Sequence, residues 1–107
     1  MDIKIFVQEF IAAINAYDTK KYLDLWQEDA VLEDKSIKQL YKSQEGVKKY
    51  FEKYFVGYKT QTRLIKLSIV NEQQAHVEVQ FTSYNQPGTF DFVFKEGKIA
   101  SAVADFK

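Results

Sequence analysis

Apolar residues recur at helical spacing in the first part of the chain. From Asp2 to Tyr17 they follow the i, i+3, i+4, i+7 pattern at Ile3, Phe6, Val7, Phe10, Ile11 and Ile14. Asp2 is a suitable N-cap residue, so this pattern predicts a helix with one buried face. Asp18 is expected to cap a second, shorter helix over residues 19–27, with an apolar side that includes Trp26.

A third helix is predicted further along, after two short segments of alternating polarity. Residues 30–34 and 38–42 have this alternation and are interpreted as strands. Ser43 is expected to start the helix and Gly57 to end it. Its apolar stripe consists of Val47, Tyr50, Phe51, Tyr54 and Phe55.

After residue 60 the apolar period changes from 3.6 to 2, which is typical of strands. Residues rich in turn formers divide this part of the chain into four segments. It therefore predicts a meander of strands at 62–70, 75–82, 90–94 and 98–106, joined by turns at 71–74, 85–88 and 96–97.

Three helices followed by a meander predict an α+β domain, a conical roll in which helices cover one face of a curved, mainly antiparallel sheet. The covered face is expected to carry Val77, Val79, Phe81, Phe90, Phe92 and Phe94. The last strand adds either the set Ala100, Ala102, Ala104 or the set Ile99, Ser101, Val103. Alanines opposite large aromatic residues would leave unfilled volume in the cone, where a ligand could bind.

The strand at 62–70 is apolar in both alternating sets, because Ile65, Leu67 and Ile69 belong to one set and Leu64 and Val70 to the other. A strand that is apolar on both sides needs a cover on each. We therefore expect a homodimer that pairs the outer faces of two sheets.

Composition places the chain among ordinary globular proteins. With 107 residues, 46% hydrophobic and 28% charged, it is expected to be one domain over residues 1–107. No segment approaches the roughly 20 apolar residues that span a bilayer, and the first residues do not resemble a secretory signal. The chain has no cysteine, which excludes thiolate chemistry and fits a cytoplasmic location.

The distribution of charge and the supply of metal-binding side chains narrow the possible classes of function further. The net charge is zero, although residues 35–66 hold nine bases and two acids. Lys48, Lys49 and Lys53 are interpreted as a solvated helix face, the alternative being a basic rim that attracts an anionic molecule or an acidic partner. Nucleic-acid binding is not expected without an overall basic excess. His76 is the only histidine and lies on a polar strand face, so no metal site or cofactor is predicted.

Four segments together resemble the nuclear transport factor 2-like superfamily, in particular its SnoaL-like and ketosteroid isomerase-like branches. They are AAINAYD, WQEDAVLED, YKSQEGVKKYFEKYF and FDFVFKEGKIAS, in that order along nearly the whole chain. The resemblance implies a conical roll with a pocket between helices and sheet, commonly assembled as a dimer through the outer sheet face. Because members of one fold carry out different reactions, the function must be argued from the site.

The resemblance implies that Asp34 occupies the position of the general base in the isomerases. Their two oxyanion donors, a tyrosine and a protonated aspartate, correspond here to Phe10 and Phe90. Loss of one such donor typically costs about 2.7–4 kcal/mol of transition-state stabilisation, so the isomerase mechanism would be badly impaired. Asp91 cannot replace the aspartate, because strand alternation turns it away from Phe90.

Two functional hypotheses follow. In the first, the cone binds a hydrophobic or aromatic small molecule beside Phe10, Ile14, Trp26, Tyr50, Tyr54, Val79, Phe81, Phe90 and Ala102. Asp34 would then serve as the base of a cofactor-free isomerase, cyclase or dehydratase. In the second, the aromatic residues only fill the core, Asp34 is a solvent-facing acid, and the protein is a non-catalytic interaction or dimerisation module. A cavity in the cone distinguishes the two.

Overall fold

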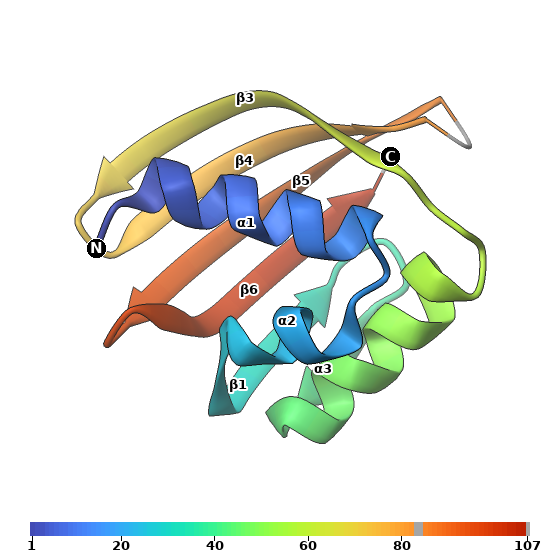
Figure 1. Cartoon of the computed structure of the whole chain (residues 1–107), viewed down its shortest axis with the longest axis horizontal. Coiled ribbons are helices and arrows are strands. Elements are labelled where there is room, and N and C mark those ends of the chain that lie inside the picture. Colours follow the sequence, from blue (N-terminus) through green and yellow to red (C-terminus); the bar gives the residue numbers. More distant parts are fainter. Residues whose placement is uncertain (83–84, 107) are drawn as a thin grey trace.

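A computed structural model of the chain describes residues 1–82 and 85–106. Its helices are α1 (Ile3–Asn15), α2 (Thr19–Asp24) and α3 (Ser43–Phe51), and α3 continues into a π-helical segment, η1 (Glu52–Val56). Its strands are β1 (Trp26–Asp34), β2 (Gln39–Lys42), β3 (Thr62–Asn71), β4 (Gln74–Phe81), β5 (Gln86–Lys95) and β6 (Lys98–Phe106). The expected α+β architecture is confirmed (Figure 1).

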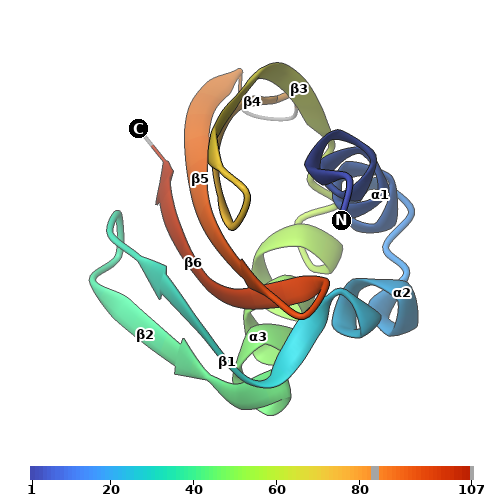
Figure 2. The same cartoon turned by 90° about the vertical axis from the view of Figure 1, so that its left-hand side faces the viewer.

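The six strands form one sheet in the order β2-β1-β6-β5-β4-β3. Only β1 and β6 run parallel, and the other neighbours are antiparallel. Figure 2 shows the sheet curling around α3, with the three helices on its concave side. Seen this way, the sheet is the wall of the cone and the helices lie within its curve.

Local side-chain contacts explain where the first two helices begin. Asp2 Oδ1 accepts a hydrogen bond from the Ile5 amide at 3.1 Å, and Asp18 Oδ1 accepts one from the Lys21 amide at 3.1 Å. Each bond satisfies a backbone donor that has no partner within the helix, so both N-cap predictions are confirmed.

Two predicted boundaries are wrong. The second helix ends at Asp24, because Trp26 already pairs with Ile99 of β6 and starts β1. The turn expected at 85–88 is misplaced, because β5 begins at Gln86 and its first three residues pair with the end of β4. The predicted turn at 96–97 is confirmed, and both of its residues have positive φ, as a tight hairpin turn requires.

Two irregularities in the strands change which side chains share a face. On β3 the register shifts at Ile65, so Leu64, Leu67 and Ile69 all pair with inward-facing residues of β4. The outer side of this strand then carries Lys66 and Ser68 together with Ile65. The two alternating sets are therefore divided differently from the expectation, since an extra residue resets the alternation, and Ile65 is the apolar side chain that remains exposed on the outer face.

The last strand, β6, has a similar register shift, so its buried residues come from both of the alternating sets that the sequence offered. Phe94 pairs with Ile99 and Phe92 with Ala102, with Ala100 as the extra residue. Ile99, Ala102 and Ala104 are consequently the buried members of β6. The concave face thus combines residues from both expected sets.

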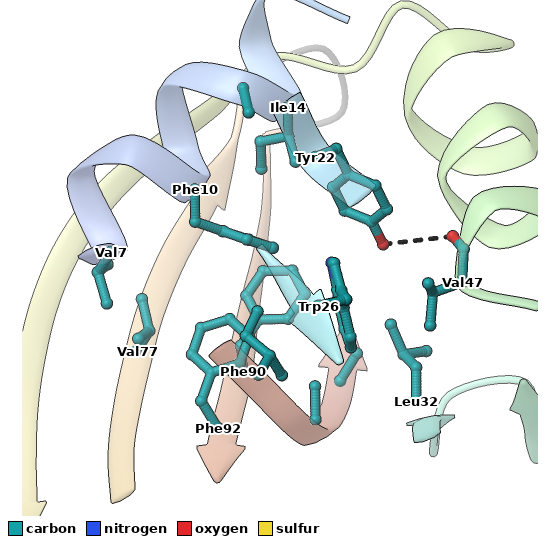
Figure 3. Close-up of a cluster of buried hydrophobic side chains, with 14 of the residues drawn as sticks. Val7, Phe10, Ile14, Tyr22, Trp26, Leu32, Val47, Val77, Phe90 and Phe92 are labelled. Atoms are coloured by element: carbon teal, nitrogen blue, oxygen red, sulfur yellow. Dashed lines mark hydrogen bonds between the residues drawn. The ribbon is translucent and has the colours of Figure 1, made fainter. Parts of the chain in front are cut away.

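Aromatic side chains fill the middle of the cone (Figure 3). The Phe10 ring centroid lies 5.6 Å from that of Phe90 and 5.1 Å from that of Phe92, both edge to face. Tyr22 stacks on Phe51 at 4.2 Å and donates its hydroxyl to the Val47 carbonyl at 3.3 Å. These rings occupy the space that the sequence led us to expect as free volume beside the alanines.

Candidate functional site

Asp34 lies at the buried end of β1 with only 2% of its surface exposed. Its Oδ1 accepts hydrogen bonds from the Ser36 amide at 2.9 Å and from the Ser36 hydroxyl. Its Oδ2 accepts one from the Tyr50 hydroxyl of α3 at 2.7 Å. The turn after β1 and helix α3 therefore hold the carboxylate from two sides.

Tyr50 and Tyr41 belong to a group of phenols around this carboxylate. Tyr50 is 1% exposed, and burial, the hydrogen bond to Asp34 and the charge of Asp34 raise the pKa of its hydroxyl well above the ordinary value. Burial also raises the pKa of Tyr41, and hydrogen bonding to Tyr54 and the charge of Asp34 add to this effect. These phenols are hydrogen-bonding groups that keep their protons at neutral pH.

The contacts of Asp34 determine what it can do chemically. A carboxylate that accepts three hydrogen bonds is a satisfied buried acceptor rather than the solvent-facing acid of our second hypothesis. To take a proton from a substrate it would have to exchange the Tyr50 hydroxyl for that substrate. Asp34 also does not line the aromatic pocket at one end of the cone.

A pocket of about 320 Å³ lies at one end of the cone. The wall comes from η1 and the loop after it on one side and from the ends of β4, β5 and β6 on the other. Tyr54, Phe55, Tyr58, Thr60, Phe81, Gln86 and Phe106 line it. We call this the end pocket. Five of these residues are aromatic, and no charged side chain is among these seven residues.

The end pocket connects to the Asp34 group through Tyr54. The Tyr54 ring centroid lies 5.1 Å from that of Tyr50, whose hydroxyl bonds Asp34. Thr60 Oγ1 donates to the Tyr54 carbonyl at 2.8 Å, which ties the loop after η1 to this segment. Lys53 Nζ lies 5.2 Å from the centroid of the Tyr54 ring, the distance of a cation–π contact.

The structure separates the predicted ligand-binding residues into two groups. Tyr54 and Phe81 line the end pocket. The others are buried in the core, and they are Phe10, Ile14, Trp26, Tyr50, Val79, Phe90 and Ala102. The Trp26 indole Nε1 has no hydrogen-bond partner among the described residues. A ligand in the end pocket would therefore contact the rings that line it and would not contact the core residues directly.

The two positions that the family resemblance aligns with the oxyanion donors lie together in the core, with the Phe10 and Phe90 rings in contact. Asp91 points to the outer face of the sheet, as strand alternation predicts. There it accepts a hydrogen bond from, or pairs with, His76, with Nδ1 and Oδ1 2.6 Å apart. The concave face around Phe10 and Phe90 therefore presents aromatic rings at the positions where the resemblance implies two proton donors.

Sequence reasoning missed several residues of the site. Ser36 had a usable signal, because Asp-x-Ser is the spacing at which an aspartate binds the backbone amide two residues on. Gln86 and Phe106 had no such signal, because strands far apart in the sequence bring them to the end pocket.

In the part of the chain that the structure describes, no three acidic or histidine side chains gather as metal ligands. No helix there is long and apolar enough to cross a membrane.

Comparison with known proteins places the chain in a family. Its sequence matches the SnoaL-like domain family over residues 7–102. The chain belongs to this family. No curated protein matches it by sequence.

Solved structures of similar shape support the SnoaL-like fold. A SnoaL-like protein of unknown function from Burkholderia thailandensis has a TM-score of 0.85 at 15% identity, with 97% of this chain and 92% of the other covered. A candidate ketosteroid isomerase from Kribbella flavida has a TM-score of 0.84 at 13% identity, with 96% and 76% covered. The epoxide hydrolase/cyclase-like enzyme SalBIII has a TM-score of 0.83 at 19% identity, with 97% and 89% covered. At these identities the likeness shows the fold alone.

Proposed function

We propose that this SnoaL-like protein binds an uncharged aromatic small molecule in the end pocket. The observation that carries the proposal is a lining of five aromatic rings without a charged side chain among the residues described there. Ligand sites typically combine apolar walls with a few polar groups, and Tyr54, Tyr58 and Gln86 bring hydroxyls and an amide to this one. The volume of about 320 Å³ suits a molecule of two or three fused or linked rings.

Cofactor-free proton transfer by Asp34 is part of the proposal, as an isomerase, cyclase or dehydratase would require. In its favour, the carboxylate is buried and bonds the Tyr50 hydroxyl, and the Tyr50 ring lies against Tyr54 of the end pocket. The step requires that a bound carbonyl compound reaches Asp34 and replaces the Tyr50 hydroxyl as the partner of its carboxylate. The SalBIII and Kribbella flavida relatives share only the fold, so they do not choose the reaction.

A fluorescent, uncharged probe tests binding directly. N-Phenyl-1-naphthylamine has about 17 heavy atoms, and at about 0.3 kcal/mol per atom its binding free energy would be about 5 kcal/mol, a Kd on the order of 0.1 mM. We expect its fluorescence to rise when protein is titrated into a fixed amount of probe. Tyr54→Ala removes one wall of the end pocket and should weaken binding about tenfold or more.

Tyr17→Ala is the matched control, because Tyr17 is also a partly exposed tyrosine but does not line the end pocket. It should bind the probe as the unmodified protein does. The proposal fails if the probe does not bind at millimolar protein, or if Tyr54→Ala and Tyr17→Ala bind it equally well.

A non-catalytic interaction module, with homodimerisation through the outer sheet face, is the second candidate function. The filled centre of the cone supports it, because the aromatic rings there pack on one another. On the outer face Ile65 is 53% exposed and Val93 38% exposed, so two apolar side chains are available to a second copy. Ile65 lies there beside Glu78, Gln80 and Thr89 in a hollow of about 340 Å³.

A further inference from the structure

Gly88 lies on β5 directly beneath two rings of the end pocket. It is buried and pairs with Val79 of β4 and Phe106 of β6. A Cβ atom at this position would lie 2.7 Å from Phe106 Cδ1 and 2.8 Å from Phe81 Cε2. Carbon atoms in contact prefer about 3.5–4.0 Å, so any side chain here would force a ring to move by about 1 Å.

The reason for glycine at this position is space rather than backbone conformation. Its φ lies outside the positive range in which only glycine is comfortable, so alanine would fit the backbone. What glycine permits is that the Phe81 and Phe106 rings lie directly against the strand. They meet edge to face, with centroids 4.8 Å apart, and both line the end pocket, of which we call them the floor.

The two rings differ in how easily they can yield. Phe81 is 3% exposed and packs against Phe55 at 6.0 Å, so the far wall of the pocket limits its movement. Phe106 is only partly buried, and its other ring contact is with Phe90, with centroids 5.7 Å apart. Because Phe106 is both the nearer and the more exposed ring, a side chain at position 88 is expected to displace it more than Phe81 and so to change the lining of the end pocket.

We propose that Gly88 is a specificity-determining residue that sets the size of ligand the end pocket accepts. The inference rests on the proposed function, because it assigns a role in ligand selection at the same pocket. Without a side chain at position 88 the floor is low and a two- or three-ring molecule fits. With one, the floor rises and only a single ring fits.

The test compares a large and a small probe on Gly88→Ala. N-Phenyl-1-naphthylamine should bind at least about tenfold more weakly than to the unmodified protein, whereas phenol should lose less than about threefold. Thr89→Val is the matched control, since it changes the next residue of β5 on the outer face and should leave both affinities unchanged. Equal loss for both probes, or no loss for either, overturns the proposal.

A crystal structure of Gly88→Ala tests the position of the two rings without any ligand. We expect the Phe106 or Phe81 ring to be displaced and the end pocket to be smaller. If the unmodified protein does not bind N-phenyl-1-naphthylamine, the proposed function fails, and this crystal structure alone tests whether Gly88 sets the size of the end pocket. Rings that keep their places in the variant overturn the inference.

If Gly88→Ala does not fold, the double variant Gly88→Ala/Phe106→Ala removes the closest contact. Restored folding would then support the steric conflict between a side chain at position 88 and Phe106.

Discussion

High pH should unfold this protein through its two most deeply buried phenols. Tyr22 and Tyr50 are each 1% exposed. Burial raises the pKa of Tyr22, and burial together with the hydrogen bond to Asp34 raises that of Tyr50. In the unfolded chain both ionise near pH 10. Above that pH the unfolded state binds fewer protons than the folded state, so the free energy of unfolding falls as the pH rises.

The size of the effect follows from proton linkage. Each tyrosine that stays protonated only in the fold lowers the free energy of unfolding by about 1.4 kcal/mol per pH unit, and two lower it by about 2.7 kcal/mol. A chain of this length typically has about 5–15 kcal/mol of stability. At the lower end of that range the fold is lost about two units above pH 10, whereas below pH 10 these groups cause no pH dependence.

Urea unfolding at a series of pH values measures the slope, with the fluorescence of the buried Trp26 as the signal. Tyr22→Phe and Tyr50→Phe should each reduce the slope above pH 10 by about 1.4 kcal/mol per pH unit. At pH 7 Tyr50→Phe should also cost about 1.5–3 kcal/mol, because Asp34 loses a hydrogen bond to its charged group. The reasoning would be refuted by an unfolding free energy that stays constant above pH 10, or by variants whose slopes equal that of the unmodified protein.

Two further predictions concern catalysis and assembly. If Asp34 is a base, the protein should speed deuterium exchange at the α-carbon of bound 2-tetralone, and Asp34→Asn should slow that exchange about 100-fold; an unchanged NMR exchange rate would exclude Asp34 as the base. If the outer sheet face dimerises, sedimentation at micromolar concentration should give twice the 12.5 kDa of one chain, and Val93→Lys should give the single-chain mass; a monomeric unmodified protein would rule out this interface.

Periodicity predicted the elements of this fold well but not every side-chain direction. Alternation on β4 and on residues 90–94 of β5 correctly identified the buried residues, because no irregularity interrupts the pairing there. The shifts at Ile65 and Ala100 could not be seen, because one extra residue reverses the facing of everything after it without leaving a pattern of its own.

The site was harder to predict than the fold for a physical reason. The family resemblance pointed to Asp34, which the structure places beside Tyr50 and not at the surface. The end pocket depends on where four separate segments end, and a one-residue change in a strand end would alter its lining. Alanine at Ala102 and Ala104 suggested free volume, but the size of a residue does not show whether rings from other strands occupy that volume.

The parallel pairing of β1 with β6 has a consequence for how the chain must fold. The last strand lies in the interior of the sheet, between β1 and β5, so residues 26–34 find their partner only at residues 99–104. During synthesis the first half of the chain leaves the ribosome long before that partner exists. Contacts so distant in sequence are typical of slow folding, and until β6 is inserted β1 and β2 remain a hairpin with an open edge. This nine-residue strand therefore completes the sheet and closes the longest loop between paired strands of the described sheet.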